Sequence, residues 1–281
     1  MKSFKIKSHA KVNLALNVIG KTFKLHKIES IVSFLELHDL IYLKLIDKKD
    51  HRVTFSGQFS YNISKINTIT LLLNLLDKKK LLNNQKFQIN IVKNIPQESG
   101  MGGGSMNAAS LINFFIDKKI IRLKKNELIK ITSLIGSDVI LGVKPQNTIL
   151  SLKGKIKKYN KKIGLYTLVV KPNFGCSTKN IYSKVRKYSK SKFNFPKLSM
   201  LKVEYLCTLN NDLEEIAFKN YPKLKKIKSF LLTIANTTFV RMSGSGSSIV
   251  AYFHSKKACV NAYKQFKAKF TTHWCIVSKT I

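Results

Sequence analysis

Acidic residues are scarce in this chain. Asp and Glu together number 14 against 51 Lys and Arg, so the formal net charge is +37 at pH 7. Arginine is rare too, because only four of the basic residues are arginines, whereas proteins that read bases or clamp phosphates favour arginine. The lysines are scattered along the whole chain, as expected from codons rich in A and T. The charge therefore favours a solvated surface over a functional polyanion-binding one, and we expect no nucleic-acid partner.

Cysteine is also sparse. No two of the four cysteines are close enough to form a paired metal-ligand motif. A chain of 281 residues can bury its own core, so it does not need a disulfide framework. We therefore expect no metal site and reduced thiols that lie mostly in the interior, at Cys176, Cys207, Cys259 and Cys275.

Long hydrophobic runs are missing as well. The chain opens without an apolar stretch of signal-peptide length. Its most apolar early segment, residues 31–45, is interrupted by Glu36, His38 and Asp39, which argues against a membrane span. The sequence thus predicts a cytoplasmic protein without a membrane partner.

The hydrophobic pattern switches between strand and helix periods along the chain, which predicts an α+β or α/β fold. A run of six lysines within residues 153–162, with little apolar content, indicates a boundary between domains at 1–152 and 153–281. The expected strands are 10–18, 31–45 (one or two strands, broken near His38 and Asp39), 87–96, 165–170 and 249–253. The expected helices are 68–76, a helix from Asn107 onward, 126–135 with Asn126 as N-cap and Gly136 as stop, and 258–266.

The strongest motif is glycine-rich and lies between an expected strand and an expected helix. Four glycines stand within residues 100–104, and glycine permits backbone conformations that let several N–H groups point at one anion. The following helix adds the positive end of its dipole, so the segment predicts a phosphate cradle rather than a flexible surface loop. The residues assigned to it are Pro96, Gln97, Glu98, Ser99, Gly100, Met101, Gly102, Gly103, Gly104, Ser105 and Met106.

Two common phosphate loops do not fit this motif. A Walker A loop ends in Gly-Lys-Ser or Gly-Lys-Thr, whereas this one ends Gly104-Ser105-Met106. A dinucleotide fingerprint needs a third glycine where Ser105 stands. The loop therefore belongs to neither of these classes.

Three other segments carry candidate chemistry, each with an ordinary structural alternative. Residues 241–248 contain Gly244 and Gly246 before an apolar strand, and they form either a tight turn or a second small-residue surface at the phosphates. Asp138 follows the end of an expected helix and precedes apolar residues, so it is either a cap or a partly buried functional acid. Lys11 stands inside an apolar strand, as a solvated edge residue or as a functional cation.

These four segments, in this order, resemble the GHMP kinase superfamily, and the resemblance runs from Ala10 to about Phe253. Within it, the start Ala10–Leu16, the triple glycine and Gly136–Val139 are most similar to the branch that phosphorylates the 2-hydroxyl of a cytidine-diphosphate-linked methylerythritol in the non-mevalonate isoprenoid pathway. Met101 and Met106 depart from the pattern Gly-Leu-Gly-Gly-Gly-Ser-Ser. Rival interpretations are another small-molecule kinase of the superfamily, of the homoserine or mevalonate type, and a non-catalytic basic nucleic-acid-binding protein.

The resemblance implies a mechanism and a set of site residues. Asp138 would be the general base for the acceptor hydroxyl, and Lys11 its cationic partner. ATP would bind with Mg²⁺ at the glycine loop, with Asn67 near the adenine. The substrate residues that it implies are Asn13 for the methylerythritol, His26 and Tyr182 for the cytosine, Leu25 in place of a family tyrosine, and Thr178.

The resemblance also implies the fold. The expected arrangement is α+β with two domains, an N-terminal α/β half resembling a ribosomal protein domain and a C-terminal half with a ferredoxin-like pattern. The active site would lie in the cleft between them.

Overall fold

The computed structural model describes residues 3–23, 25–152 and 154–281. They form two compact units that interleave along the chain. The first unit comprises Met1–Ala10, Leu37–Pro96 and Gly102–Pro145, and the second comprises Lys11–Glu36, Gln97–Met101 and Gln146–Ile281. The predicted domain boundary between residues 152 and 153 stays a prediction.

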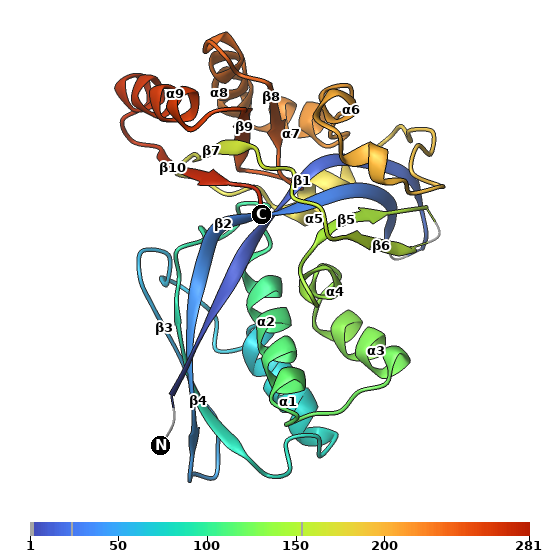
Figure 1. Cartoon of the computed structure of the whole chain (residues 1–281), viewed down its shortest axis with the longest axis vertical. Coiled ribbons are helices and arrows are strands. Elements are labelled where there is room, and N and C mark those ends of the chain that lie inside the picture. Colours follow the sequence, from blue (N-terminus) through green and yellow to red (C-terminus); the bar gives the residue numbers. More distant parts are fainter. Residues whose placement is uncertain (1–2, 24, 153) are drawn as a thin grey trace. The chain divides into compact units, whose positions relative to one another are not determined.

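Strands and helices pack into one core in the first unit. Strand β4 (Lys86–Val92) pairs antiparallel with the second half of β2 (His26–Ile46) and parallel with β3 (Arg52–Ser56). Helices α1 (Thr68–Lys78) and α2 (Gly103–Asp117) lie side by side and bury their apolar faces with these strands (Figure 1). Helices α3 (Lys125–Ile135) and α4 (Val139–Gly142) complete the unit.

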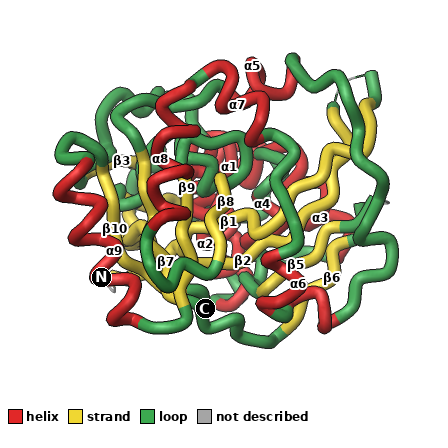
Figure 2. The backbone as a smooth tube through the Cα atoms, turned by 90° about the horizontal axis from the view of Figure 1, so that it is seen from above, coloured by secondary structure: helices red, strands yellow, loops and turns green. Residues whose placement is uncertain are grey.

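The second unit is built on a four-stranded antiparallel sheet in the order β10-β7-β9-β8. Its elements follow the chain order strand, helices, strand, strand, helix, strand, which is the ferredoxin-like pattern expected for the C-terminal half. Helices α8 and α9 lie over the sheet (Figure 2) and share a core with alternate residues of the strands. The elements are β7 (Tyr166–Lys171), α7 (Glu214–Asn220), α8 (Pro222–Thr233), β8 (Phe239–Met242), β9 (Ile249–Phe253), α9 (Lys256–Lys269) and β10 (Trp274–Lys279).

The rest of the second unit surrounds the first half of β2. Strand β5 (Asn147–Leu150) pairs antiparallel with residues 30–32 of β2 and with β6 (Ile156–Tyr159). Much of β1 (Ser3–Lys21) also belongs to this unit. The remaining elements are the short helices α5 (Thr178–Ser183), η1 (Leu198–Leu201) and α6 (Val203–Cys207).

The structure confirms the α+β class and most of the expected elements, and it corrects four details. Strand β2 continues through His38 and Asp39 without a break. Helix α2 begins at Gly103 instead of Asn107, because its first turn is built from the glycines themselves. Helix α3 is capped at Lys124, not at Asn126. Strand β4 ends at Val92 instead of Pro96.

The thiols behave as expected. All four cysteines are free, and only Cys207 is exposed. Burial raises the pKa of Cys176 to about 11, which keeps this thiol protonated at neutral pH. Across the part of the chain that the structure describes, no helix combines the length and the apolar character needed to cross a membrane.

Candidate active site

Lys11 is buried in β1 and joins a chain of polar side chains. It is only 4% exposed, so the solvated edge position is wrong. Its Nζ donates to Asn13 Oδ1 at 2.8 Å, and Asn13 Nδ2 donates to Ser30 Oγ at 2.8 Å. Its backbone N–H donates to the carbonyl oxygen of Met101 at 3.0 Å, which ties β1 to the glycine loop. A buried ammonium held in this way is oriented for a role in chemistry.

The two glycine clusters meet inside the second unit. Ser243 Oγ donates to the carbonyl oxygen of Gly100 at 2.9 Å and accepts from the Asn13 N–H at 3.3 Å. The Ser248 N–H donates to the carbonyl oxygen of Ser99 at 3.1 Å. Gly100 has φ +72°, and a Cβ there would collide with the carbonyl oxygen of Ser243. Only glycine therefore satisfies both the backbone angle and the space at this position.

Asn211 forms hydrogen bonds with the backbone of the second glycine cluster, and the sequence pattern did not identify it. Its Nδ2 donates to the carbonyl oxygens of Met242 at 2.8 Å and Gly244 at 2.7 Å. The side chain is 3% exposed. It fixes the turn in which Gly244 and Gly246 take φ values of +54° and +84°.

The remaining part of the glycine loop belongs to the first unit, where it starts α2. Gly102 is the N-cap with φ 68°, and the helix begins at Gly103. Thr68 Oγ1, in the first turn of α1, donates to the carbonyl oxygen of Gly104 at 2.9 Å. A Cβ on Gly103 would lie 3.1 Å from Lys93 Nζ. The start of α2 has no side-chain cap, so its first N–H groups remain available to an anion.

The side chain of Asn67 caps helix α1. Its Oδ1 accepts from the N–H groups of Ile69 at 3.0 Å and Thr70 at 3.2 Å, which makes it the N-cap of α1. Its Nδ2 donates to the carbonyl oxygen of Ser64 at 2.9 Å. Capping of this kind occupies the side chain. A contact of Asn67 with adenine stays a prediction, and Thr68 is the residue of α1 that reaches the glycine loop.

Asp39 is the main residue that sequence reasoning missed, because it was interpreted as a strand break. It is fully buried. Its carboxylate accepts from Lys93 Nζ, from the N–H groups of Asn94 at 2.7 Å and Ile95 at 2.8 Å, and from Asn107 Nδ2 at 2.9 Å. It thus joins the end of β4, which leads into the glycine loop, to the second turn of α2. An acidic residue in a strand of apolar residues is the sequence signal for such a site.

We expect Asp39→Ala to lower the free energy of unfolding by about 3–5 kcal/mol, because it leaves the ammonium of Lys93 buried and unpaired. Urea denaturation monitored by circular dichroism measures this change. The double variant Asp39→Ala with Lys93→Met should recover part of the loss, since no buried charge then remains. A loss below about 1 kcal/mol in the single variant would contradict the assignment of this network.

Asp138 also lies in the first unit, at the N-cap of α4, and it is half-buried as expected. Helix α4 packs closely on α2: a Cβ on Gly142 would lie 2.7 Å from Ala109 Cβ and 2.9 Å from Met106 Sδ. Met106 is therefore a buried packing residue at 2% exposure. Met106 stands where the family pattern has a serine, and its larger side chain fills space against α4. Asp138 is the N-cap of that helix. The pairing of Lys11 with Asp138 stays a prediction.

Two of the predicted substrate residues, His26 and Tyr182, lie together in the second unit. Their ring centroids are 5.2 Å apart, with an interplanar angle of 38°. Burial, and secondarily the charge of Lys21, lower the pKa of His26, which keeps its imidazole neutral at pH 7. A neutral imidazole can both donate and accept hydrogen bonds, as recognition of a base edge requires.

Leu25 and Thr178, two further predicted substrate residues, differ in their surroundings. Leu25 is 68% exposed on the turn between β1 and β2, so its side chain is accessible to a ligand. Thr178 Oγ1 lies 2.8 Å from Ser245 Oγ, which connects α5 to the second glycine cluster.

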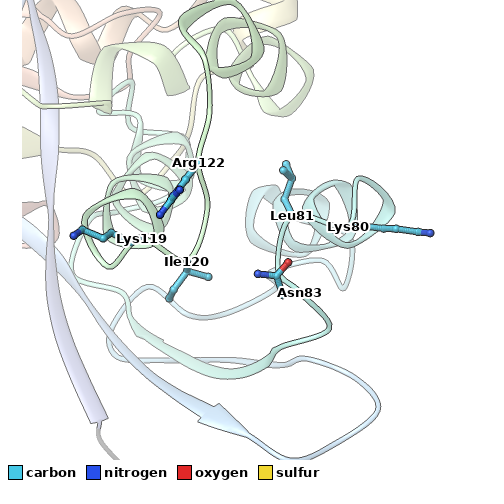
Figure 3. Close-up of a pocket in the computed structure, with 6 residues that line it drawn as sticks. All are labelled: Lys80, Leu81, Asn83, Lys119, Ile120 and Arg122. Atoms are coloured by element: carbon cyan, nitrogen blue, oxygen red, sulfur yellow. The ribbon is translucent and has the colours of Figure 1, made fainter.

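A basic hollow in the first unit is not part of this site (Figure 3). It measures about 370 Å³ and lies just beyond the C-terminal ends of α1 and α2, opposite the ends that carry Thr68 and Gly103. The side chains of Lys80 and Lys119 point away from it in Figure 3. Cations near a helix C-terminus interact favourably with the helix dipole. This interaction explains the two lysines, and no bound ligand is needed to explain them. The residues that line it are Lys80, Leu81, Asn83, Lys119, Ile120 and Arg122.

Comparison with known proteins agrees with this architecture. The family of the GHMP kinases N terminal domain matches residues 67–155. A crystal structure of a 4-(cytidine 5'-diphospho)-2C-methyl-D-erythritol kinase superimposes with a TM-score of 0.80 at 20% identity, over 99% of both chains. The fold is thus that of the GHMP kinases.

Sequence relatives define the family more closely. The chain is 63% identical to the 4-diphosphocytidyl-2-C-methyl-D-erythritol kinase of Pelagibacter ubique over 281 residues, which is the full length of both proteins. It is 31% identical to the enzyme of the same name from Clostridium tetani, over 99% of this chain and 100% of the relative. The chain belongs to the 4-diphosphocytidyl-2-C-methyl-D-erythritol kinase family.

Proposed function

We propose that the protein transfers the γ-phosphoryl group of ATP to the 2-hydroxyl of 4-diphosphocytidyl-2-C-methyl-D-erythritol, in the non-mevalonate route to isoprenoid precursors. The observation that carries this proposal is the 63% identity to a kinase of that name over the whole chain. The glycine clusters, Lys11 and the His26–Tyr182 ring pair support it from the structure.

Phosphoryl transfer depends mainly on positioning and on electrostatic stabilisation, so few residues need to act. The backbone of residues 100–106 holds the phosphates, and the N-terminus of α2 adds the positive end of its dipole. Asp138 accepts the proton of the acceptor hydroxyl as attack develops. Lys11 offsets charge on the moving phosphoryl group.

The residues at the glycine loop also fit Mg²⁺ carried by ATP. Helix α2 starts at Gly103 without a side-chain cap, so its first backbone N–H groups can bind the triphosphate that carries the ion. When bound, Mg²⁺ would neutralise part of the triphosphate charge. We propose no protein ligand for the ion. The cytoplasmic location expected from the sequence stays a prediction.

A coupled assay of ADP release tests the function. We expect turnover with the cytidylyl substrate and none with homoserine or mevalonate. Turnover with either of the latter instead would assign the chain to another GHMP activity. Salt-dependent binding to nucleic acid without ATP turnover would favour the non-catalytic alternative.

We expect Tyr182→Ala to weaken binding of the cytidylyl substrate by about 1–3 kcal/mol, because stacking of a base on an aromatic ring contributes this much. Leu25→Tyr should keep or strengthen binding, since it adds an aromatic face at an exposed position. Isothermal titration calorimetry measures both effects. The affinity for ATP serves as the internal control and should barely change. Unaltered substrate affinity in Tyr182→Ala would remove this ring from the cytosine pocket and leave the acceptor open.

A further inference from the structure

The amide of Asn13 has a defined orientation in the buried chain that begins at Lys11. Lys11 Nζ donates to its oxygen, and its nitrogen donates to Ser30 Oγ. Ser30 Oγ in turn donates to the carbonyl oxygen of Ala15 at 2.6 Å. Lys11, Asn13 and Ser30 are 4%, 5% and 1% exposed, so water cannot easily replace any of these bonds.

The single hydrogen of Ser30 favours the same orientation of the amide as the ammonium of Lys11 does. A serine hydroxyl has one hydrogen to donate, and the carbonyl of Ala15 takes it. Ser30 Oγ can then only accept from Asn13, which turns the amide nitrogen toward Ser30 and the amide oxygen toward Lys11. The flipped amide would set two donors against each other at Lys11 and leave the ammonium without this acceptor.

Gly244 lies next to the buried ammonium. A Cβ on Gly244 would lie 3.5 Å from both Lys11 Nζ and Asn13 Oδ1, so the second glycine cluster faces this pair. The glycine keeps side-chain atoms away from the ammonium. The orientation of Lys11 therefore depends on Asn13, and that of Asn13 on Ser30.

We propose that Ser30 is a positioning residue for phosphoryl transfer, acting through the amide of Asn13 on the ammonium of Lys11. This inference rests on the proposed function, in which Lys11 is catalytic. Ser30 makes no contact with substrate in this scheme. Its effect should therefore appear in the chemical step and not in the binding of ATP.

We expect Ser30→Ala to lower kcat by about 10-fold with the KM for ATP unchanged, because the amide loses the acceptor that orients it. The matched pair Ser30→Thr and Ser30→Val has nearly the same shape and differs in the hydroxyl. The threonine variant should retain kcat and the valine variant should lose it. Steady-state kinetics on each full-length variant, with thermal unfolding as a check of folding, measures this contrast.

Ser33 supplies a control on the same strand. It is fully buried, and its Oγ has no hydrogen-bond partner among the described residues. Ser33→Ala should leave kcat unchanged, which separates the role of Ser30 from the general loss of a buried hydroxyl in β2.

A double-mutant cycle tests whether Ser30 acts through Asn13. In the Asn13→Ala background, Ser30→Ala should change kcat by less than about twofold, because its target is already gone. A full additional loss in that background, or a normal kcat in Ser30→Ala itself, would overturn the inference.

Lys11→Met separates this inference from the proposed function. An inactive Lys11→Met together with a normal Ser30→Ala overturns the inference alone. An active Lys11→Met removes Lys11 from the mechanism and overturns both.

Discussion

Replacing Asp138 by Asn is expected to lower kcat by about 10²-fold or more while the affinity for ATP stays nearly unchanged. Asparagine keeps the shape of the side chain but cannot accept the proton of the acceptor hydroxyl. The backbone at this position should not move, because α4 is held against α2 by the close packing of Gly142 on Ala109 and Met106. Coupled ADP release gives kcat, and calorimetry gives the ATP affinity.

Asp117→Asn is the matched control for this experiment. Asp117 is an exposed acid at the end of α2, in the same unit as Asp138. Its replacement removes the same charge and should leave kcat unchanged. If Asp138→Asn retains most of its turnover, Asp138 is not the base, and the mechanism needs another proton acceptor.

The second large effect is expected for Gly103→Val, which should weaken ATP binding by about 10²-fold or more while the fold survives. Gly103 is the first residue of α2, where the proposed mechanism brings a phosphate close to the backbone. An added Cβ would also lie 3.1 Å from Lys93 Nζ and 3.3 Å from Ile95 Cγ2, so its branched methyl groups would displace the ammonium. Calorimetric titration with ATP, together with circular dichroism, measures both parts of the expectation.

Two further variants test whether the loss of ATP binding comes from the bulk of the side chain added at Gly103. Gly103→Ala should show a smaller loss, because contacts of 3.1–3.4 Å can relax around a single methyl group. Gly20→Val is the control, since a Cβ at Gly20 meets only the side chain of Lys27 at 3.8 Å. Normal ATP binding in Gly103→Val would show that the phosphates are held elsewhere.

The sequence by itself determined the elements whose periodicity is local, together with the family. Strand β4 was predicted because every second residue is apolar and buried. Helix α1 was predicted because its buried residues recur every three to four positions. The glycine loop was also visible in the sequence, since its composition alone excludes most other structures at that place. The order of four short motifs along the chain was sufficient for the resemblance to GHMP kinases.

Only the tertiary structure decided which polar groups are buried and what they bind. Asp39 was interpreted as a strand break, yet it lies within β2. Its carboxylate can be buried there because it has partners in Lys93–Ile95 and Asn107. Ser30 was also missed, because its partners Asn13 and Ala15 lie on the neighbouring strand β1. The cost of burying a polar group is offset only by a partner, and the partners of Asp39 and Ser30 come from other segments of the chain. No local pattern encodes such a pairing, so the support of the candidate site became visible only in the folded chain.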